Sequence, residues 1–338
     1  MFRNDYSDPA AKEVLEAVIK LSGEQNPGYG EDRHSANAKE LIRSYFGIPD
    51  ADIHFLAGGT VTNMTVISYF LKPYEAVIAC DTAHINVHET GAVEASGHKV
   101  ITCPNNDGKL IAGDVEKAFL LHSDEHMVKP RMVYISDATE TGTVYTKDEL
   151  CALRDVCDRY GLLLFLDGAR LGPALTCGEH AVEPEFIANI CDVFYAGGTK
   201  NGLLFGEAVI IKDPAISEYF RYHIKNRGAM LAKGFVVGAQ FEALFTDRLF
   251  EKLAANSVEK AMYIKKSLVG CGAEFEGSSP TNQQFIRLGH EQAKALEENF
   301  GCEKWSENET GVLMRIVTSF STTKEDCDEL IEFIKNLL

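Results

Sequence analysis

Two apolar runs of this chain are each followed closely by a residue that suits covalent or proton-transfer chemistry. Residues 162–166 are almost wholly apolar, which predicts a strand covered on both faces, and Asp167 comes directly after them. Ligands of open α/β sheets bind at the carboxyl ends of strands. A carboxylate there suits a protonated ring nitrogen, which it would keep charged. Aspartate is also a common turn residue, so a structural role is the alternative.

Lys200 follows the second run, residues 192–196, within the sequence Gly-Gly-Thr-Lys-Asn-Gly. Glycines permit a ligand to approach the backbone closely. A lysine becomes a Schiff-base nucleophile when burial or a nearby cation destabilises its ammonium group. Most lysines are simply solvated. The position at a strand end nevertheless favours a Schiff-base role for Lys200, with Thr199 as a neighbour of the lysine or of a phosphate.

Gly58 and Gly59 separate an expected strand, residues 53–56, from a helix that begins at about Thr60. Free N–H groups and the macrodipole make a helix N-terminus an anion site, to which Thr60 adds a hydroxyl. The sequence is neither GxGxxG nor a Walker loop, so nucleotide binding is not supported. An ordinary helix cap is the alternative.

Two histidines follow the expected strand 76–80. An imidazole at the position of His84 can stack on an aromatic ring or move protons. His88 lies four residues further on, so both rings face one cleft if the segment is helical. The pair does not form an HExxH motif, so we expect no metal. The alternative is that His88 is a surface residue and His84 acts alone.

In this order, a Gly-Gly-Thr anion turn, a histidine, a strand-end aspartate and a strand-end lysine resemble the fold-type I enzymes that use pyridoxal phosphate (PLP). More specifically, the chain is similar to the threonine aldolase and β-eliminating lyase family over nearly its whole length. The residues that carry the likeness are Arg3-Asn4-Asp5, Tyr29-Gly30-Glu31-Asp32, Gly59-Thr60, Asn63, His84, Glu89, Thr139-Glu140-Thr141-Gly142-Thr143-Val144-Tyr145, Asp167-Gly168-Ala169-Arg170, Lys200 and Arg315.

The resemblance implies roles for these residues. Lys200 would form the Schiff base with PLP, Asp167 would pair with the pyridine nitrogen, and His84 would stack on the ring. The phosphate would be held by Gly58, Gly59 and Thr60.

Arg170 and Arg315 would bind a cofactor oxygen or the substrate carboxylate, for which a guanidinium fork is suited. The chain departs from the family at Asn4 and Gly58, where members often have serine, and at His88, where an aromatic residue is common. Asn4 is still expected to contact the substrate. The change at His88 bears on stereochemical preference and substrate size.

The implied reaction is retro-aldol cleavage of threonine, allo-threonine or a related β-hydroxy-α-amino acid to glycine and an aldehyde. The base that removes the β-hydroxyl proton is His84, His88 or a water that they position. Another PLP reaction on the same fold, β-elimination or transamination, is the nearest alternative. A non-catalytic protein of this fold is a more distant one, against which the presence of both Lys200 and Asp167 argues.

The resemblance also implies a homodimer or homotetramer with shared active sites. Lys225 and Arg227 form a basic patch that would reach the cofactor phosphate of a neighbouring subunit. The alternative is a solvated surface patch.

The bulk composition limits the kinds of partner. The 338 residues carry a net charge of −17, which argues against a nucleic-acid partner because phosphates need Lys and Arg to neutralise them. The nine cysteines form no CxxC pair, so we expect reduced thiols and a cytoplasmic location. No signal peptide and no membrane span are expected either.

The elements that must position these residues alternate along the chain. Strands are expected at 53–56, 76–80, 132–136, 162–166, 192–196 and 208–211, with helices at 61–71 and 147–160. Such alternation predicts an α/β domain with a mainly parallel sheet. From about residue 246 a long helix, two strands and two more helices indicate a small α+β domain, so we expect domains at 1–245 and 246–338.

Overall fold

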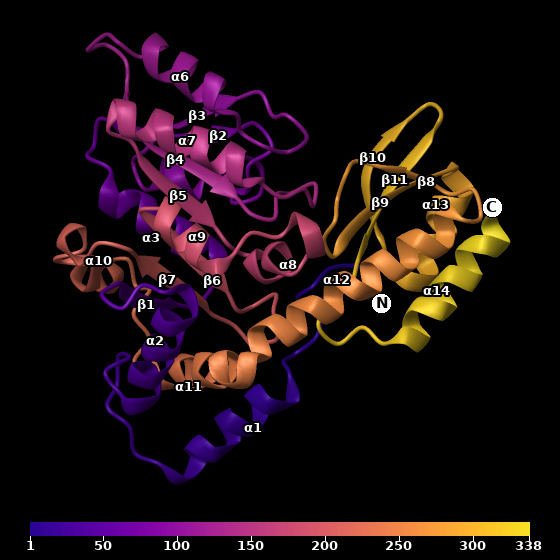
Figure 1. Ribbon diagram of the computed structural model, residues 1–338, viewed down its shortest axis with the longest axis horizontal. Coiled ribbons are helices and arrows are strands. Elements are labelled where there is room, and N and C mark those ends of the chain that lie inside the picture. The colour runs from indigo at the N-terminus through magenta and orange to yellow at the C-terminus, as the bar shows by residue number, and fades with distance from the viewer.

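The computed structural model describes residues 1–338, except for the side chain of Glu179. A seven-stranded sheet forms the centre of the larger lobe in Figure 1. In spatial order its strands are β1 (Asp52–Leu56), β7 (Glu207–Ile211), β6 (Val193–Gly197), β5 (Leu163–Asp167), β4 (Lys129–Ser136), β2 (Glu75–Cys80) and β3 (Val100–Cys103).

The sheet confirms the predicted fold class. Strands β3, β2, β4, β5 and β6 run parallel to one another, whereas β7 is antiparallel to both β6 and β1. The turn between β6 and β7, residues 198–206, is too short for the crossover helix that a parallel neighbour requires. Strands β2, β6 and β7 are buried along their whole length, as expected of a sheet covered on both faces.

Helices connect these strands and cover the sheet (Figure 1). The first half of the chain has α1 (Lys12–Lys20), α2 (Arg33–Phe46), α3 (Gly59–Phe70), α4 (His84–Val87), α5 (Ala92–Ala95) and α6 (Ala112–Leu121). The second half of the domain has α7 (Lys147–Tyr160), α8 (Leu171–Leu175), α9 (Pro184–Ile190), α10 (Phe220–Asn226) and α11 (Phe235–Phe245).

Helix α7 shows how local sequence sets these boundaries. Thr146 and Glu149 form a capping box that satisfies free N–H groups at the start of the helix. Gly161 ends it with a φ of 63°, a left-handed conformation that glycine adopts without a steric penalty. The helix therefore spans the residues that the sequence predicts, and it delivers the chain directly into β5.

The smaller lobe is built on a four-stranded antiparallel sheet with its own apolar core. In spatial order its strands are β10 (Glu303–Asn308), β11 (Gly311–Val317), β9 (Gln283–Leu288) and β8 (Glu274–Glu276). Helices α12 (Leu249–Val269), α13 (His290–Phe300) and α14 (Lys324–Leu337) belong to this part of the chain. Helix α12 runs from the larger lobe into the smaller one (Figure 1). The expected division at 245/246 lies just before this helix.

The N-terminal segment connects the two lobes. Phe2 lies in the core of the smaller lobe, where its N–H donates to the Phe300 carbonyl at 2.9 Å and its carbonyl accepts from Val317 N–H at 3.0 Å. Nine residues later, Ala11 N–H donates to the carbonyl of Gly202, in the turn after β6. The segment between these anchors therefore crosses from one lobe to the other.

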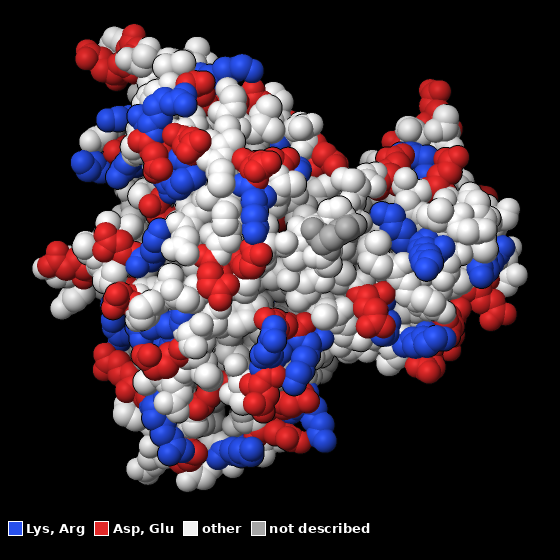
Figure 2. Space-filling view, viewed as in Figure 1, with Lys and Arg blue, Asp and Glu red and all other residues white. Residues whose placement is uncertain are grey.

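The surface carries charges of both signs. On the face shown in Figure 2, Lys and Arg side chains are interspersed with Asp and Glu over both lobes. Among the residues that the structure describes, no helix is both long enough and apolar enough to cross a membrane. All nine cysteines are free thiols.

Candidate active site

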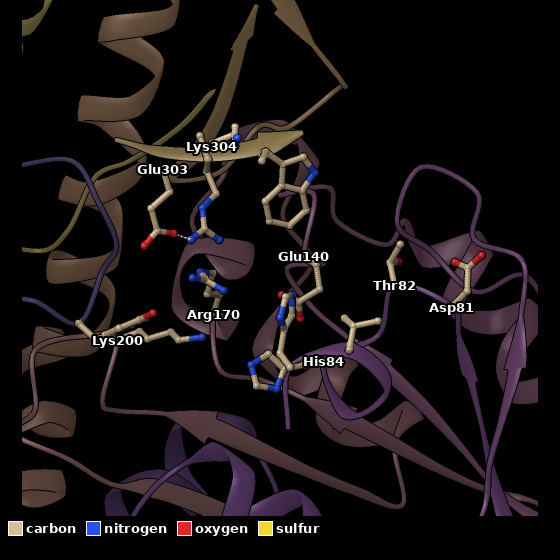
Figure 3. A pocket seen from close by; sticks show the side chains of 13 residues that line it. Asp81, Thr82, His84, Glu140, Arg170, Lys200, Glu303 and Lys304 are labelled. Carbon is tan, nitrogen blue, oxygen red and sulfur yellow. Dashed lines mark hydrogen bonds and ion pairs between the residues drawn. The ribbon is translucent and has the colours of Figure 1, made fainter. Parts of the chain in front are cut away.

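Most of the predicted site residues line two adjoining cavities, of which the larger is lined from both lobes. We call the smaller one, about 230 Å³, the inner cavity and the larger one, about 590 Å³, the outer cavity. Tyr6, His84, Glu140, Arg170 and Lys200 line both of them. Figure 3 shows four of these side chains converging from different elements.

Asp167 and Lys200 reach the inner cavity because β5 and β6 are parallel neighbours whose carboxyl ends lie at one edge of the sheet. The backbone segments at the ends of β5 and β6 approach each other very closely there. A Cβ at Gly168 would lie 1.9 Å from the Tyr195 carbonyl oxygen, and one at Gly197 would lie 2.6 Å from the Ala169 carbonyl oxygen. Glycine is therefore required at both positions for the two strand ends to approach each other.

Burial, followed by the positive charge of Arg170, lowers the pKa of Lys200, although Asp5 and Glu140 act in the opposite direction. A lowered pKa favours the neutral amine, which is the nucleophilic form. Lys200 Nζ lies 5.9 Å from the centre of the Tyr6 ring. Its position and protonation both fit the predicted Schiff-base role.

The Asp167 carboxylate accepts hydrogen bonds at both oxygens. Oδ1 accepts from Tyr195 Oη and, at 3.0 Å, from Ala169 N–H. Oδ2 accepts from Tyr134 Oη and, at 3.0 Å, from Asn63 Nδ2. Burial by itself would raise the pKa of Asp167, but the charge of His84 and these hydrogen bonds hold it below its ordinary value. Asp167 is therefore a buried anion.

His84 is oriented by a second buried carboxylate. Its Nδ1 lies 2.8 Å from Glu89 Oε1, and the same oxygen accepts from Asn63 Nδ2 at 2.8 Å. Burial lowers the pKa of His84, but the hydrogen bond with Glu89 and the charges of Glu140 and Asp167 together outweigh burial and raise the pKa overall. Asn63 thus joins the Glu89–His84 pair to Asp167 in one network.

The segment after Ala83 is helical, which is the condition under which His84 and His88 were expected to face one cleft. His88 N–H donates to the His84 carbonyl at 2.9 Å, and the ring centres lie 5.4 Å apart. His88 lines the outer cavity and is exposed. Burial, opposed by Glu140 and reinforced by His84, lowers the pKa of His88. Its neutral ring can accept a proton, whereas His84 favours the charged form.

The anion turn also lies where it was expected. Gly58, Gly59 and Thr60 line the inner cavity at the start of α3. Thr199 lines the same cavity, where it donates to Glu207 Oε1 at 2.7 Å and accepts from Gly206 N–H at 3.0 Å.

Glu207 also lines the inner cavity, although it was not predicted from the sequence. Its Oε2 accepts from Gly198 N–H at 3.1 Å, and burial raises its pKa to about 8. A carboxylic acid that stays neutral there would not repel an anion bound at the Gly58 turn. No residue pattern near Glu207 points to this role, because its side chain reaches the cavity from the first residue of β7.

Arg170 is buried, and its guanidinium is already paired with a carboxylate. Its Nε lies 2.8 Å from Asp5 Oδ2 and its Nη2 lies 3.0 Å from Asp5 Oδ1, while Asn282 Nδ2 also donates to Asp5 at 2.9 Å. Burial opposes ionisation of Asp5, but the charges of Arg170 and Lys200 and the hydrogen bonds from Arg170 and Asn282 together outweigh burial and keep the pKa of Asp5 low. Arg170 thus connects the N-terminal segment to the strand-end site while still lining both cavities.

Arg315 reaches the outer cavity from β11 in the smaller lobe. Its Nη2 lies 2.5 Å from Glu303 Oε2, and its guanidinium lies 5.3 Å from the centre of the Trp305 ring. Glu303 and Trp305 also line the outer cavity, and neither was predicted from the sequence. Both lie on β10, which was not expected as a strand.

Three predicted site residues lie outside the linings of both cavities. Asn4 Oδ1 accepts from Tyr6 N–H at 3.1 Å and from Ser7 Oγ at 2.8 Å, so it stabilises its own turn. Lys225 Nζ lies 4.6 Å from the centre of the Tyr29 ring, and Arg227 Nε lies 3.5 Å from His223 Nε2. Lys225 lies on α10 and Arg227 directly follows it, in another part of the surface.

The residues of the inner cavity fit PLP. An amine, a buried carboxylate, an imidazole and a helix N-terminus with an adjacent hydroxyl line one space, and these groups match its carbonyl, ring nitrogen, ring face and phosphate. A metal-dependent alternative finds no such support, because no group of three or more His, Cys, Asp or Glu in the described part of the chain is placed to hold a metal ion.

Together the mixed seven-stranded sheet, the smaller lobe and the strand-end lysine and aspartate define the class of fold-type I PLP-dependent enzymes. A solved structure of a PLP-bound putative aminotransferase from Clostridium difficile 630 has this fold, with a TM-score of 0.73 over 100% of this chain and 91% of that one, at 14% identity.

The chain belongs to the beta-eliminating lyase family, whose profile matches residues 2–304. It is 31% identical to a low specificity L-threonine aldolase from Pseudomonas sp. (strain NCIMB 10558), over 87% of this chain and 86% of that protein. It is 43% identical to the solved structure of Leishmania major threonine aldolase, with a TM-score of 0.97 over 99% of this chain and 98% of that one. The predicted family is thereby confirmed.

Proposed function

We propose that this chain is a PLP-dependent aldolase that cleaves L-threonine, L-allo-threonine or a related β-hydroxy-α-amino acid to glycine and an aldehyde. The observation that carries the proposal is that Lys200 and Asp167 both line one cavity, at the ends of neighbouring parallel strands. The relatives support it, because the Pseudomonas and Leishmania major proteins are both named threonine aldolases.

Cofactor binding is assigned to the inner cavity. Lys200 would hold the cofactor covalently, Asp167 would face its ring nitrogen, and His84 would cover one face of its ring. Gly58, Gly59, Thr60 and Thr199 bind its phosphate. When bound, PLP supplies an electron sink that accepts the electron pair of the broken Cα–Cβ bond.

Substrate binding is assigned to the outer cavity. Arg315 binds the substrate carboxylate, for which it must exchange Glu303 for the ligand. The β-hydroxyl then lies toward His84 and His88 on α4. His88 is the better proton acceptor of the two, because its pKa is lowered while that of His84 is raised.

Glu140 adds a carboxylate whose charge acts on the two histidines and on Arg170. It lines both cavities, and its charge favours protonation of His84 and His88. A proton taken from the β-hydroxyl by His88 is therefore stabilised on the ring. The role of Glu140 in this proposal is to hold that charge close to the broken bond.

Assembly and location are further parts of the proposal. A homodimer or homotetramer would bring Lys225 and Arg227 to the phosphate of a neighbouring subunit, while Asn4 would contact the substrate. The nine free thiols support a cytoplasmic location.

The test uses purified protein reconstituted with PLP. L-Threonine and L-allo-threonine are expected to yield equal amounts of glycine and acetaldehyde, and borohydride reduction is expected to fix PLP to Lys200. Lys200→Ala should abolish both, whereas Lys72→Ala, at an exposed lysine, should change neither. Release of ammonia and a keto acid in place of the aldehyde would establish β-elimination instead, a reaction that the family name makes the second candidate.

A further inference from the structure

We propose that Tyr134 and Tyr195 are positioning residues that keep a proton on the ring nitrogen of the cofactor rather than on Asp167. The inference rests on the proposed function, in which Asp167 faces that nitrogen. It concerns two side chains for which neither the sequence pattern nor the relatives' names indicate a role.

The two tyrosines come from the strands on either side of β5. In the register of the sheet, Ser136 of β4 pairs with Asp167, so Tyr134, two residues earlier, lies on the same face as Asp167. On the other side, Phe194 of β6 pairs with Leu166, which places Tyr195 level with Asp167. The sheet therefore directs one phenol at each oxygen of the carboxylate.

Both phenols are committed to this contact. Tyr134 and Tyr195 are 0% and 1% exposed, and each donates its hydroxyl proton to Asp167. Within the described chain, neither hydroxyl donates to another acceptor. Burial and the Asp167 charge raise the pKa of both phenols well above the ordinary value, so both remain protonated donors.

The other two donors at Asp167 are less specific. Asn63 Nδ2 is shared with Glu89, at 2.8 Å, and so also serves the pair with His84. Ala169 contributes a backbone N–H, which every side-chain variant retains. The tyrosines are therefore the donors whose removal changes Asp167 and leaves the rest of the network in place.

These donors decide where a shared proton resides. A pyridine nitrogen and a buried carboxylate can form an ion pair, with the proton on nitrogen, or a neutral pair, with the proton on oxygen. Burial favours the neutral pair, because separated charges lose solvation. Hydrogen bonds donated to the carboxylate favour its charged form and hence the ion pair. Two phenols at one carboxylate thus keep the ring nitrogen charged, which is the form that accepts electrons.

The experiment measures the proton directly. The holoenzyme is prepared with PLP labelled with ¹⁵N at the ring nitrogen, whose chemical shift distinguishes the protonated from the neutral form. The variants are Tyr134→Phe, Tyr195→Phe and the double variant. Tyr145→Phe is the matched control, because Tyr145 is 2% exposed and its hydroxyl accepts from Leu110 N–H at 2.7 Å, away from Asp167.

Each single substitution is expected to lower the ratio of protonated to neutral nitrogen by about tenfold or more, since a hydrogen bond to a charged group is lost. The double variant should be lowered further, and the control should match the wild type. A fully protonated nitrogen in both single variants, or an equal change in the control, would overturn the inference. The single variants decide the matter even if the double variant does not fold.

A fourth variant separates this inference from the proposed function. Asp167→Asn should leave the nitrogen neutral, because an amide holds no proton on it. If the nitrogen stays protonated in that variant, the assignment of Asp167 itself fails. If it becomes neutral while both tyrosine variants stay protonated, the proposed function stands and the role of the tyrosines fails.

Discussion

The inner and outer cavities adjoin each other but are built in different ways. The inner cavity lies at the edge of a buried parallel sheet, and Asp167 there is fixed by four donors. The outer cavity includes a wall from the smaller lobe, where Arg315 is held mainly by one partly exposed glutamate, Glu303. Under the proposed function, the cofactor end of the site is held by several buried hydrogen bonds, whereas Arg315 at the substrate end must exchange Glu303 for a ligand.

The largest effect should come from the inner cavity. Asp167→Asn removes a buried charge that faces the cofactor and should lower aldolase activity on the order of 10²-fold or more, as expected when one member of a buried charge pair is lost. Steady-state assays with L-threonine measure this. Asp155→Asn, at an exposed aspartate, is the control. Activity near that of the wild type would show that the inner cavity is not built around this carboxylate.

The next effect concerns stability. Asp5→Ala leaves the Arg170 guanidinium buried without its carboxylate and should lower the free energy of unfolding by about 3–5 kcal/mol. Glu31→Ala, which breaks the exposed pair with Arg221, should cost about 0–1 kcal/mol. Urea unfolding of the two cofactor-free variants measures both. Equal losses in the free energy of unfolding would mean that the buried Asp5–Arg170 pair stabilises the protein no more than the exposed Glu31–Arg221 pair.

A third change tests the outer cavity without disturbing the inner one. His88→Phe removes the proposed proton acceptor and should lower kcat by roughly 10²-fold or more, with a changed ratio of threonine to allo-threonine cleavage. The PLP absorbance should be retained, because His88 does not line the inner cavity. An unchanged rate together with an unchanged ratio would remove His88 from the mechanism.

The smallest effect should come from Glu303. Glu303→Gln frees Arg315 from a partly exposed ion pair and should lower KM for threonine by about two- to fivefold, with kcat nearly constant. Glu307→Gln, on the same strand but outside the cavity lining, is the control. A higher KM would show that Glu303 orients Arg315 for the substrate instead of competing with it.

The residues that line the inner cavity could be predicted because short, local sequence patterns place them there. A strand followed by an acid or by a glycine-rich turn with a lysine places that residue at the sheet edge, whatever the rest of the chain does. Asp167, Lys200, His84 and the turn at Gly58 all line one cavity.

The contacts that tune these residues could not be predicted in the same way. Tyr134 and Tyr195 read as ordinary core residues of two strands, and only the register of the sheet directs both hydroxyls at Asp167. Arg170 and Asp5 are 165 residues apart, and their pairing depends on how the N-terminal segment crosses the cleft. Glu303 reaches the outer cavity from β10, and this strand was not predicted from the sequence.

That crossing segment also limits how far the lobes can separate. Phe2 is fastened to the smaller lobe and Asp5 to Arg170 in the larger one. Only Arg3 and Asn4 lie between them, so the three residue-to-residue steps from Phe2 to Asp5 can extend to roughly 10 Å at most, given about 3.3–3.6 Å per residue. As long as the contacts of Phe2 and Asp5 both hold, the cleft beside Tyr6 can widen only by the distance that the connecting segment can still extend.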